Sequence, residues 1–310
     1  METSLAVTDT STAAQPHLST ADAALIPTET PGIAVANRSF DAIVAALRSA
    51  LLTLTAPQQP VSVAVPPVIA RALLERVGYV DGFPNLLGTV HSFAGSPARW
   101  HELQLARDEQ NAPWHTAQQI TDVAVLPATC YHLYPLFEGK DLTEPVVVTA
   151  EAYCYRNEGT HEHGRLRSFR MREFVRIGVA DEVTEWRDAW VSRAERWLGD
   201  LGLDVSVVPA SDPFFGGAGR LMGATQREQQ LKWELTAPVG DGAVQAVASA
   251  NYHKDHFGTP FSIRIGGETA HTACAAFGLE RITLALLAAH GPDPASWPAR
   301  VRATLAVDPR

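Results

Sequence analysis

The chain has 310 residues, 46% of them hydrophobic and 19% charged, an ordinary balance for a globular protein that buries a large core. Its formal net charge of −9 argues against broad binding to a nucleic-acid backbone, which needs a basic surface. The three cysteines are too few for a disulfide framework, so a reducing cytoplasm is expected. No apolar run approaches the roughly 20 residues that span a bilayer, and no signal peptide is recognisable, so no membrane partner is predicted.

The N-terminal third is predicted to hold a tail followed by helices. Residues 1–33 are rich in Ala, Thr, Ser and Pro and are predicted to be a disordered tail. Apolar residues at helical spacing, from Phe40 to Leu51, predict an amphipathic helix over residues 39–54. A further helix is expected over residues 68–77, and residues 99–106 are expected to form a short helix or a connector.

Strand patterns dominate the remainder of the chain. They are predicted over residues 123–126, 145–155, 165–179, 204–208, 230–235, 243–250 and 261–265. Two helices are predicted, over residues 182–201 and 279–290, and the tryptophans of the first are assigned to the core. Turn-length links without strict β–α alternation favour an antiparallel sheet with helices beside it, an α+β fold.

The segment from Tyr155 to Glu173 reads as two strands around a loop, with charges on a face that usually buries hydrocarbon. Successive strand residues point to opposite faces, so Arg156 and Glu158 share a face of the first strand. On the second strand one face would carry Arg165, Arg167, Phe169, Met171 and Glu173. Arginines for phosphate, an aromatic ring for a base and carboxylates for amines or metal together predict a nucleotide site.

This pattern resembles motif 2 of the class II aminoacyl-tRNA synthetases: Arg-x-Glu, a loop, Arg-x-x-x-Phe, then Glu. The stretch from Cys274 through Arg281 to His290 resembles motif 3, and residues 61–88 are a weaker match to motif 1. The motifs stand in the family's order, and the zinc-containing seryl branch is the most similar. The resemblance implies a class II synthetase-like catalytic domain over residues 34–310, with an antiparallel sheet flanked by helices.

The resemblance also implies roles at the nucleotide site. Arg156 would bridge the α-phosphate of ATP and the carboxylate that attacks it. Glu158 would accept a hydrogen bond from the adenine amino group, and Phe169 would stack on adenine. Arg281 would hold the γ-phosphate at the start of a helix, where the dipole favours anions. Arg165 is the better match to the family's second γ-phosphate arginine.

Some of these positions have alternatives. Arg167 is a second candidate for the role given to Arg165. From the residues alone, Arg156 could instead form a surface ion pair with Glu158 or Glu151.

For the metal, the resemblance implies one Zn²⁺ per chain, held by Cys130, Glu173 and Cys274, with an open position for the substrate amine. Spacing alone would favour free buried cysteines. Cys154 is assigned to packing.

Other metal positions are less clear from the sequence. Mg²⁺ should accompany ATP, but the family's usual glutamate has no clean counterpart, and Gln245, Ser249 or Glu234 lie near its expected place. The pairs His161–His163 and His253–His256 are weak candidates for a second metal site.

Finally, the chain resembles the amino acid:[carrier protein] ligases, truncated seryl-synthetase homologues. These activate a small amino acid, glycine or alanine, as an aminoacyl-adenylate and transfer it to the phosphopantetheine thiol of a carrier protein. Arg220, Arg227 or the helices of residues 35–110 are candidates for carrier docking. A homodimer is expected and tRNA binding is not. A minimal tRNA synthetase and a catalytically silent regulatory module are the alternatives.

Overall fold

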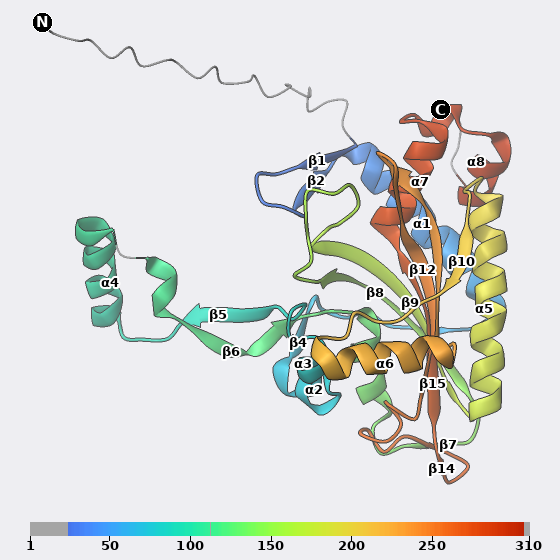
Figure 1. Cartoon of the computed structure of the whole chain (residues 1–310), viewed down its shortest axis with the longest axis horizontal. Helices are drawn as coiled ribbons and strands as arrows, with labels where there is room; N and C mark the ends of the chain where they lie inside the picture. The colour runs from blue at the N-terminus through green and yellow to red at the C-terminus, as the bar shows by residue number, and fades with distance from the viewer. Residues whose placement is uncertain (1–23, 112, 307–310) are drawn as a thin grey trace, which may run out of the picture.

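The computed structural model describes residues 24–111 and 113–306. A seven-stranded sheet organises the fold (Figure 1). In spatial order its strands are β10 (Ser206–Pro209), β11 (Lys232–Gly240), β12 (Ala243–Lys254), β15 (His271–Gly278), β9 (Ser168–Gly178), β8 (Val146–Tyr155) and β3 (Val61–Ser62). All neighbours are antiparallel except β3, which runs parallel to β8. The predicted α+β class is therefore confirmed, with one parallel edge strand added.

One face of the sheet packs on the large helices. These are α1 (Arg38–Thr55), α5 (Ala180–Asp200), α7 (Leu279–His290) and α8 (Ala299–Leu305). Trp190 and Trp197 of α5 are buried in this core beside Phe174 and Phe277 of the sheet, which confirms the packing role predicted for the tryptophans.

Short elements cover the opposite face. They are β4 (Val68–Ala70), α2 (Arg71–Arg76), α3 (Tyr79–Gly82), η3 (Thr129–His132), η4 (Tyr134–Phe137), β7 (Asp141–Leu142), α6 (Gly216–Glu228), β13 (Arg264–Ile265) and β14 (Glu268–Thr269). A second, smaller core lies between them and the sheet.

The remaining elements lie at the periphery. β5 (Thr89–Phe93), α4 (Pro97–Gln110), η2 (Trp114–Ala117) and β6 (Gln118–Val125) form an arm that reaches away from the sheet (Figure 1). The other short 3₁₀ turns are η1 (Ala56–Gln58) and η5 (Pro294–Ser296).

Helix α1 begins at an N-cap, where the side chain of Asn37 accepts a hydrogen bond of 2.9 Å from the Phe40 amide. By length and composition alone α1 is apolar enough to be a candidate membrane span, which the sequence prediction did not anticipate. However, its apolar stripe lies in the large core, and Arg48 in its middle forms an ion pair with Glu151 of the sheet. These contacts are those of a core helix.

The structure corrects two predicted elements and adds a helix that was not predicted. Residues 1–23 of the predicted tail lie outside the described residues, but its last part forms a hairpin of β1 (Leu25–Pro27) and β2 (Ala34–Ala36). The helix expected over residues 68–77 starts as strand β4, because its first residues pair with β6. Helix α6 was not predicted, since its glycine-rich sequence has a low helix propensity.

Two arginines of β9, Arg170 and Arg172, are buried. Arg170 donates 2.6 Å and 2.8 Å hydrogen bonds to Glu280 through its amide and Nε, and it also pairs with Asp41 of α1. Arg172 pairs with Glu151 at 3.1 Å. Both arginines point to the helix-covered face, so their charges are neutralised inside the fold and form no surface patch.

Removing one member of the buried Arg170–Glu280 pair should strongly destabilise the fold. Arg170→Met should lower the free energy of unfolding by about 3–5 kcal/mol, because Glu280 would be left buried without its cation. Arg99→Ala, which breaks the exposed pair with Glu102, should cost less than about 1 kcal/mol. Equilibrium urea unfolding measures both. A similar small loss for the two variants would show that Glu280 does not depend on Arg170.

Candidate active site

The register of the sheet brings distant residues into two adjacent rows on the face opposite the large helices. In one row Lys232 lies opposite Asn251, and Asn251 opposite Cys274. In the next row the partners, from β11 to β8, are Glu234, Ser249, Ala276, Glu173 and Ala150. Charged and polar side chains thus stand beside small ones on this face of the sheet.

The predicted metal ligands meet at these rows. Cys130 is supplied by η3, Glu173 by β9 and Cys274 by β15, and their ligand atoms all lie within 4.8 Å of one another. All three residues are buried. Among the described residues this is the one such group found, and neither predicted histidine pair forms another.

The electrostatics of this group favour a divalent cation. Burial, and then the charge of Cys274, raise the pKa of Glu173 to about 7. A shared hydrogen bond holds the pKa of Cys274 low and raises that of Cys130. Three groups that become negative on ionisation repel one another at this distance, and a cation would relieve the repulsion. Two thiolates and one carboxylate are a donor set suited to zinc, and three protein ligands leave one position open.

Neighbouring groups orient these ligands. The Thr129 and Cys130 amides donate hydrogen bonds of 2.7 Å and 3.3 Å to Glu173 Oε1. Asn251 Nδ2 donates to Cys274 Sγ at 3.3 Å, and His253 on the same strand also lowers the pKa of Cys274. Sequence reasoning missed Asn251 and considered His253 only as one of a histidine pair. Only the register of β12 against β15 could have found them.

The nucleotide residues predicted around motif 2 lie at the end of the same face. The guanidinium of Arg156 stands over the ring of Phe169, 5.7 Å from its centroid, and Arg156 Nε donates to the Pro127 carbonyl at 3.3 Å. Glu158 lies close enough to Arg156 to favour its charged form. Glu151 pairs with Arg48 and Arg172 on the opposite side of the sheet, so it is not the partner of Arg156.

Arg281 completes a cluster of arginines. Its Nε and Nη1 donate to the carbonyls of Gly164 and Ala246 at 3.1 Å and 3.0 Å. Burial lowers the pKa of Arg281, and the charges of Arg156 and Arg165 lower it further. Two cations of the β8–β9 loop and one of α7 are therefore held near one another, an arrangement that favours a polyanionic ligand.

The strand geometry predicted for the arginines is partly wrong. Strand β8 ends at Tyr155 and β9 begins at Ser168, so Arg156, Arg165 and Arg167 lie in the connecting loop. Arg165 forms an ion pair of 3.1 Å with Glu162 of that loop. Loop residues do not alternate between two faces, so the parity argument holds only from Phe169 onward.

The structure places two of the three positions considered for Mg²⁺ side by side and the third elsewhere. Glu234 and Ser249 face each other across β11 and β12. Gln245 instead donates to the His163 carbonyl at 2.8 Å, below the motif 2 loop. Lys232 stands beside Glu234 at 3.2 Å, a neighbour that the sequence did not reveal.

The sheet and the site together define a class II aminoacyl-tRNA synthetase core. Residues 115–290 match the family model described as the tRNA synthetase class II core domain (G, H, P, S and T). The seryl-tRNA synthetase of Methanopyrus kandleri, solved in complex with tRNASec of A. aeolicus, superposes with a TM-score of 0.76 at 21% identity. The match covers 91% of this chain and 58% of that one.

Two curated relatives narrow the class. Amino acid–[acyl-carrier-protein] ligases 1 and 2 of Bradyrhizobium diazoefficiens are each 41% identical to this chain. The alignments cover 79% and 76% of it, and 76% and 72% of the relatives. A type-2 serine–tRNA ligase of Methanococcus aeolicus is 26% identical over 76% of this chain and 48% of its own length. The chain belongs to the amino acid–[acyl-carrier-protein] ligase family, and the predicted enzyme class, an ATP-dependent ligase, is confirmed.

Loss of one ligand should remove the metal. Wild-type protein purified without chelator is expected to contain about one zinc ion per chain, and Cys130→Ser less than about a tenth of that. Cys154→Ser is the matched control, since Cys154 is equally buried but outside the ligand group. Plasma mass spectrometry of the desalted proteins gives the ratio. Full zinc in Cys130→Ser would contradict the ligand set.

Proposed function

We propose that this enzyme activates a small amino acid with ATP and transfers it to the phosphopantetheine thiol of a carrier protein. The observation that carries the proposal is the meeting of the Cys130–Glu173–Cys274 group and the arginine cluster on one face of the sheet. The first group would bind the amine of an amino acid and the second the phosphates of ATP. Two such sites on one face suit a reaction that joins an amino acid to ATP.

The first step would form an aminoacyl-adenylate. A bound zinc ion would supply an open position for the substrate amine and so select substrates that carry one. Arg156 would hold the substrate carboxylate in line with the α-phosphate, Phe169 would stack on adenine, and Glu158 would accept from its amino group. Arg281 and Arg165 would bind the γ-phosphate. The carboxylate oxygen attacks the α-phosphorus, and pyrophosphate leaves.

In the second step the thiol sulfur attacks the carbonyl carbon of the adenylate. The bond from that carbon to the phosphate oxygen breaks, AMP leaves, and the thiol proton passes to solvent. The product is a thioester on the carrier. The names of the two ligases that are 41% identical support a carrier protein as acceptor.

A small amino acid is the substrate that we favour. The positions flanking Glu173 in its row are Ala276 and Ala150, and Ser249 follows Ala276. None of these three side chains is charged, so they offer no partner to a charged substrate side chain. The resemblance to the carrier-protein ligases implies glycine or alanine.

Other parts of the proposal follow from the chemistry. Mg²⁺ would enter with ATP and neutralise its phosphates, and Glu234 of β11 is the acidic candidate for its ligand. We expect a homodimer, as in class II cores that pair through motif 1, and a place in the cytoplasm. Serine activation for tRNA is the second candidate, and it is supported by the type-2 serine–tRNA ligase relatives at lower identity.

Helix α6 is the surface we propose for carrier docking. Leu221 and Met222 of this helix are exposed, and so is Phe215 just before it. Together the three side chains form an apolar group that is unusual for a solvent-facing helix. Arg220 and Arg227 on the same helix supply positive charge for an acidic carrier protein. Helix α4 also exposes Trp100 and Leu105, but α6 is connected to the active-site row through Asp212 and Lys232.

Amino-acid-dependent exchange of pyrophosphate into ATP, measured across all twenty amino acids, tests the first step. Exchange with glycine or alanine is expected, followed by loading of a phosphopantetheinylated carrier protein and no charging of tRNA. Arg281→Ala should lower the exchange rate by about 100-fold but keep its metal. Exchange with serine together with tRNA charging would favour the second candidate. No exchange with any amino acid would reject adenylation.

Charge reversal on α6 should weaken carrier binding. Arg220→Glu combined with Arg227→Glu should raise the KM for the carrier protein by at least about tenfold, while pyrophosphate exchange stays unchanged. Arg196→Glu, on an exposed position of α5, is the control for the loss of positive charge. An unchanged KM in the double variant would place the docking surface elsewhere.

A further inference from the structure

Helix α6 is held in an unusual way. Of its thirteen residues only Gly219 and Gly223 are buried, so no apolar stripe fixes it to the core. A Cβ at Gly219 would lie 2.6 Å from the Phe214 backbone, which shows how closely the helix approaches the segment leading into it. That segment is anchored by stacking of Phe214 on Phe83 of the chain after α3, with ring centroids 4.9 Å apart. The orientation of α6 therefore depends on hydrogen bonds and on the packing of its neighbouring segments, because few of its own side chains are buried.

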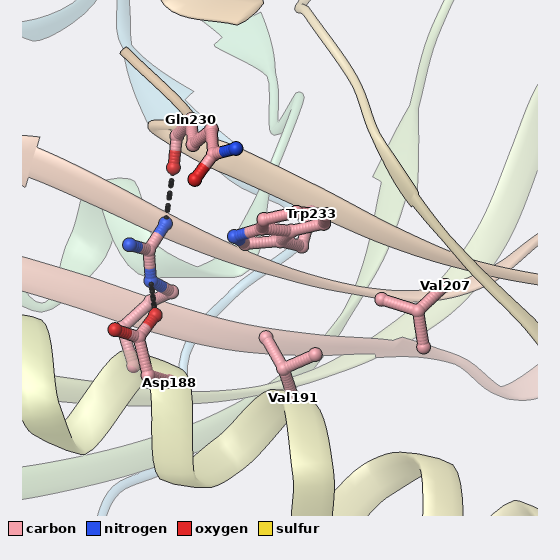
Figure 2. Close-up of a pocket in the computed structure, with 6 residues that line it drawn as sticks. Asp188, Val191, Val207, Gln230 and Trp233 are labelled. Carbon is pink, nitrogen blue, oxygen red and sulfur yellow. Dashed lines mark hydrogen bonds and ion pairs between the residues drawn. The ribbon is translucent and has the colours of Figure 1, made fainter.

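The C-terminal end of α6 is fixed by a hydrogen bond to a buried arginine of α5. The chain turns from α6 into β11 through Gln230, whose φ is +50°. The Gln230 carbonyl accepts a 2.6 Å hydrogen bond from Nη1 of the buried Arg187 on α5. Figure 2 shows this guanidinium held between the Gln230 carbonyl and the carboxylate of Asp188, beside Trp233. This hydrogen bond fixes the C-terminal end of α6. The direction of the helix axis must be set by contacts of residues within the helix.

Asp212 ties the helix to the sheet one turn before that end. Gln226 of α6 accepts from the Asp212 amide at 2.6 Å and donates to its Oδ2 at 2.9 Å. The other carboxylate oxygen, Oδ1, accepts from Lys232 Nζ of β11 at 2.6 Å. Lys232 is buried, pairs also with Glu234, and stands in the same row as Asn251 and Cys274.

The Asp212 carboxylate stays charged in this position. Burial would raise its pKa, but Lys232, Gln226 and Arg156 lower it to about 2. Asp212 thus has one oxygen on the helix and one on the charged row of the active site. From α6 itself, Gln226 holds this carboxylate, and the neighbouring Arg227 donates to Ser211 Oγ at 3.0 Å.

We propose that Gln226 and Asp212 are positioning residues that latch α6 to the active-site face and so direct a docked carrier toward the adenylate. The inference rests on the proposed function, since it assigns a role within carrier loading. With the latch intact, a carrier seated on Leu221 and Met222 presents its arm in one orientation. Without it, the carrier still finds the exposed surface, but the helix no longer holds that orientation. Misplacement of a reacting group by a small distance costs rate more than binding.

The test compares Gln226→Ala with Gln229→Ala, a glutamine just beyond α6 whose side chain accepts from the exposed Lys254. Three rates are measured for each: pyrophosphate exchange, aminoacylation of free pantetheine, and aminoacylation of the carrier protein. For Gln226→Ala, exchange and pantetheine transfer should stay within about twofold of wild type. Carrier loading should fall at least about tenfold, mainly in kcat. Gln229→Ala should match wild type in all three.

Several outcomes would overturn the latch. Equal carrier loading by the two variants would show that Gln226 does not position the helix. An equal fall in exchange would place its effect on activation, and a rise in KM alone would make it part of the docking surface. If Gln226→Ala does not fold, Gln226→Met keeps the volume without the hydrogen bonds and carries the same expectation. If wild type neither exchanges nor loads, the proposed function fails first, and the latch with it.

Discussion

The antiparallel register of β12, β15 and β9 is the constraint on which the site depends. Asn251 faces Cys274 across one ladder, and Ala276 faces Glu173 across the next. A slip of one residue in β15 or β9 would turn Cys274 or Glu173 toward the large helices, since side chains alternate between the faces. The core helices that bury the other face hold this register, because the same slip would expose their apolar partners.

The two faces of the sheet handle charge differently. On the helix side, Arg170 meets Glu280 within the fold, so charge is neutralised by charge. On the other side, Arg156 and Arg165 lie near Arg281, whose pKa is lowered by burial and then by their charges. The buried ion pair on the helix side stabilises the fold, whereas the group of arginines on the other side is suited to binding an anion. Glu280 and Arg281 are adjacent on α7, so the same helix turn serves both faces.

The covering face is built from short elements and polar contacts. Helix α6 rests on two glycines and on Asp212, while α5 and α7 rest on apolar stripes. Elements held by few apolar contacts are the ones whose position can be altered without unfolding the domain. A surface that receives a second protein can be built in this way at little cost to the core.

The sequence by itself determined the class of fold and the positions of the long helices. Periodicity placed α7 on residues 279–290 as observed, because a long apolar stripe is a local property of the chain. The resemblance to the synthetase motifs predicted that Cys130, Glu173 and Cys274 act together, and the structure brings the three residues close to one another. The tertiary structure decided what depends on strand pairing and loop paths. It moved the arginines off the strands, revealed Asn251 beside Cys274, and joined Asp212 to Lys232. Those contacts link residues that are distant in the chain or lie in loops, where no local pattern encodes which partner a side chain will meet.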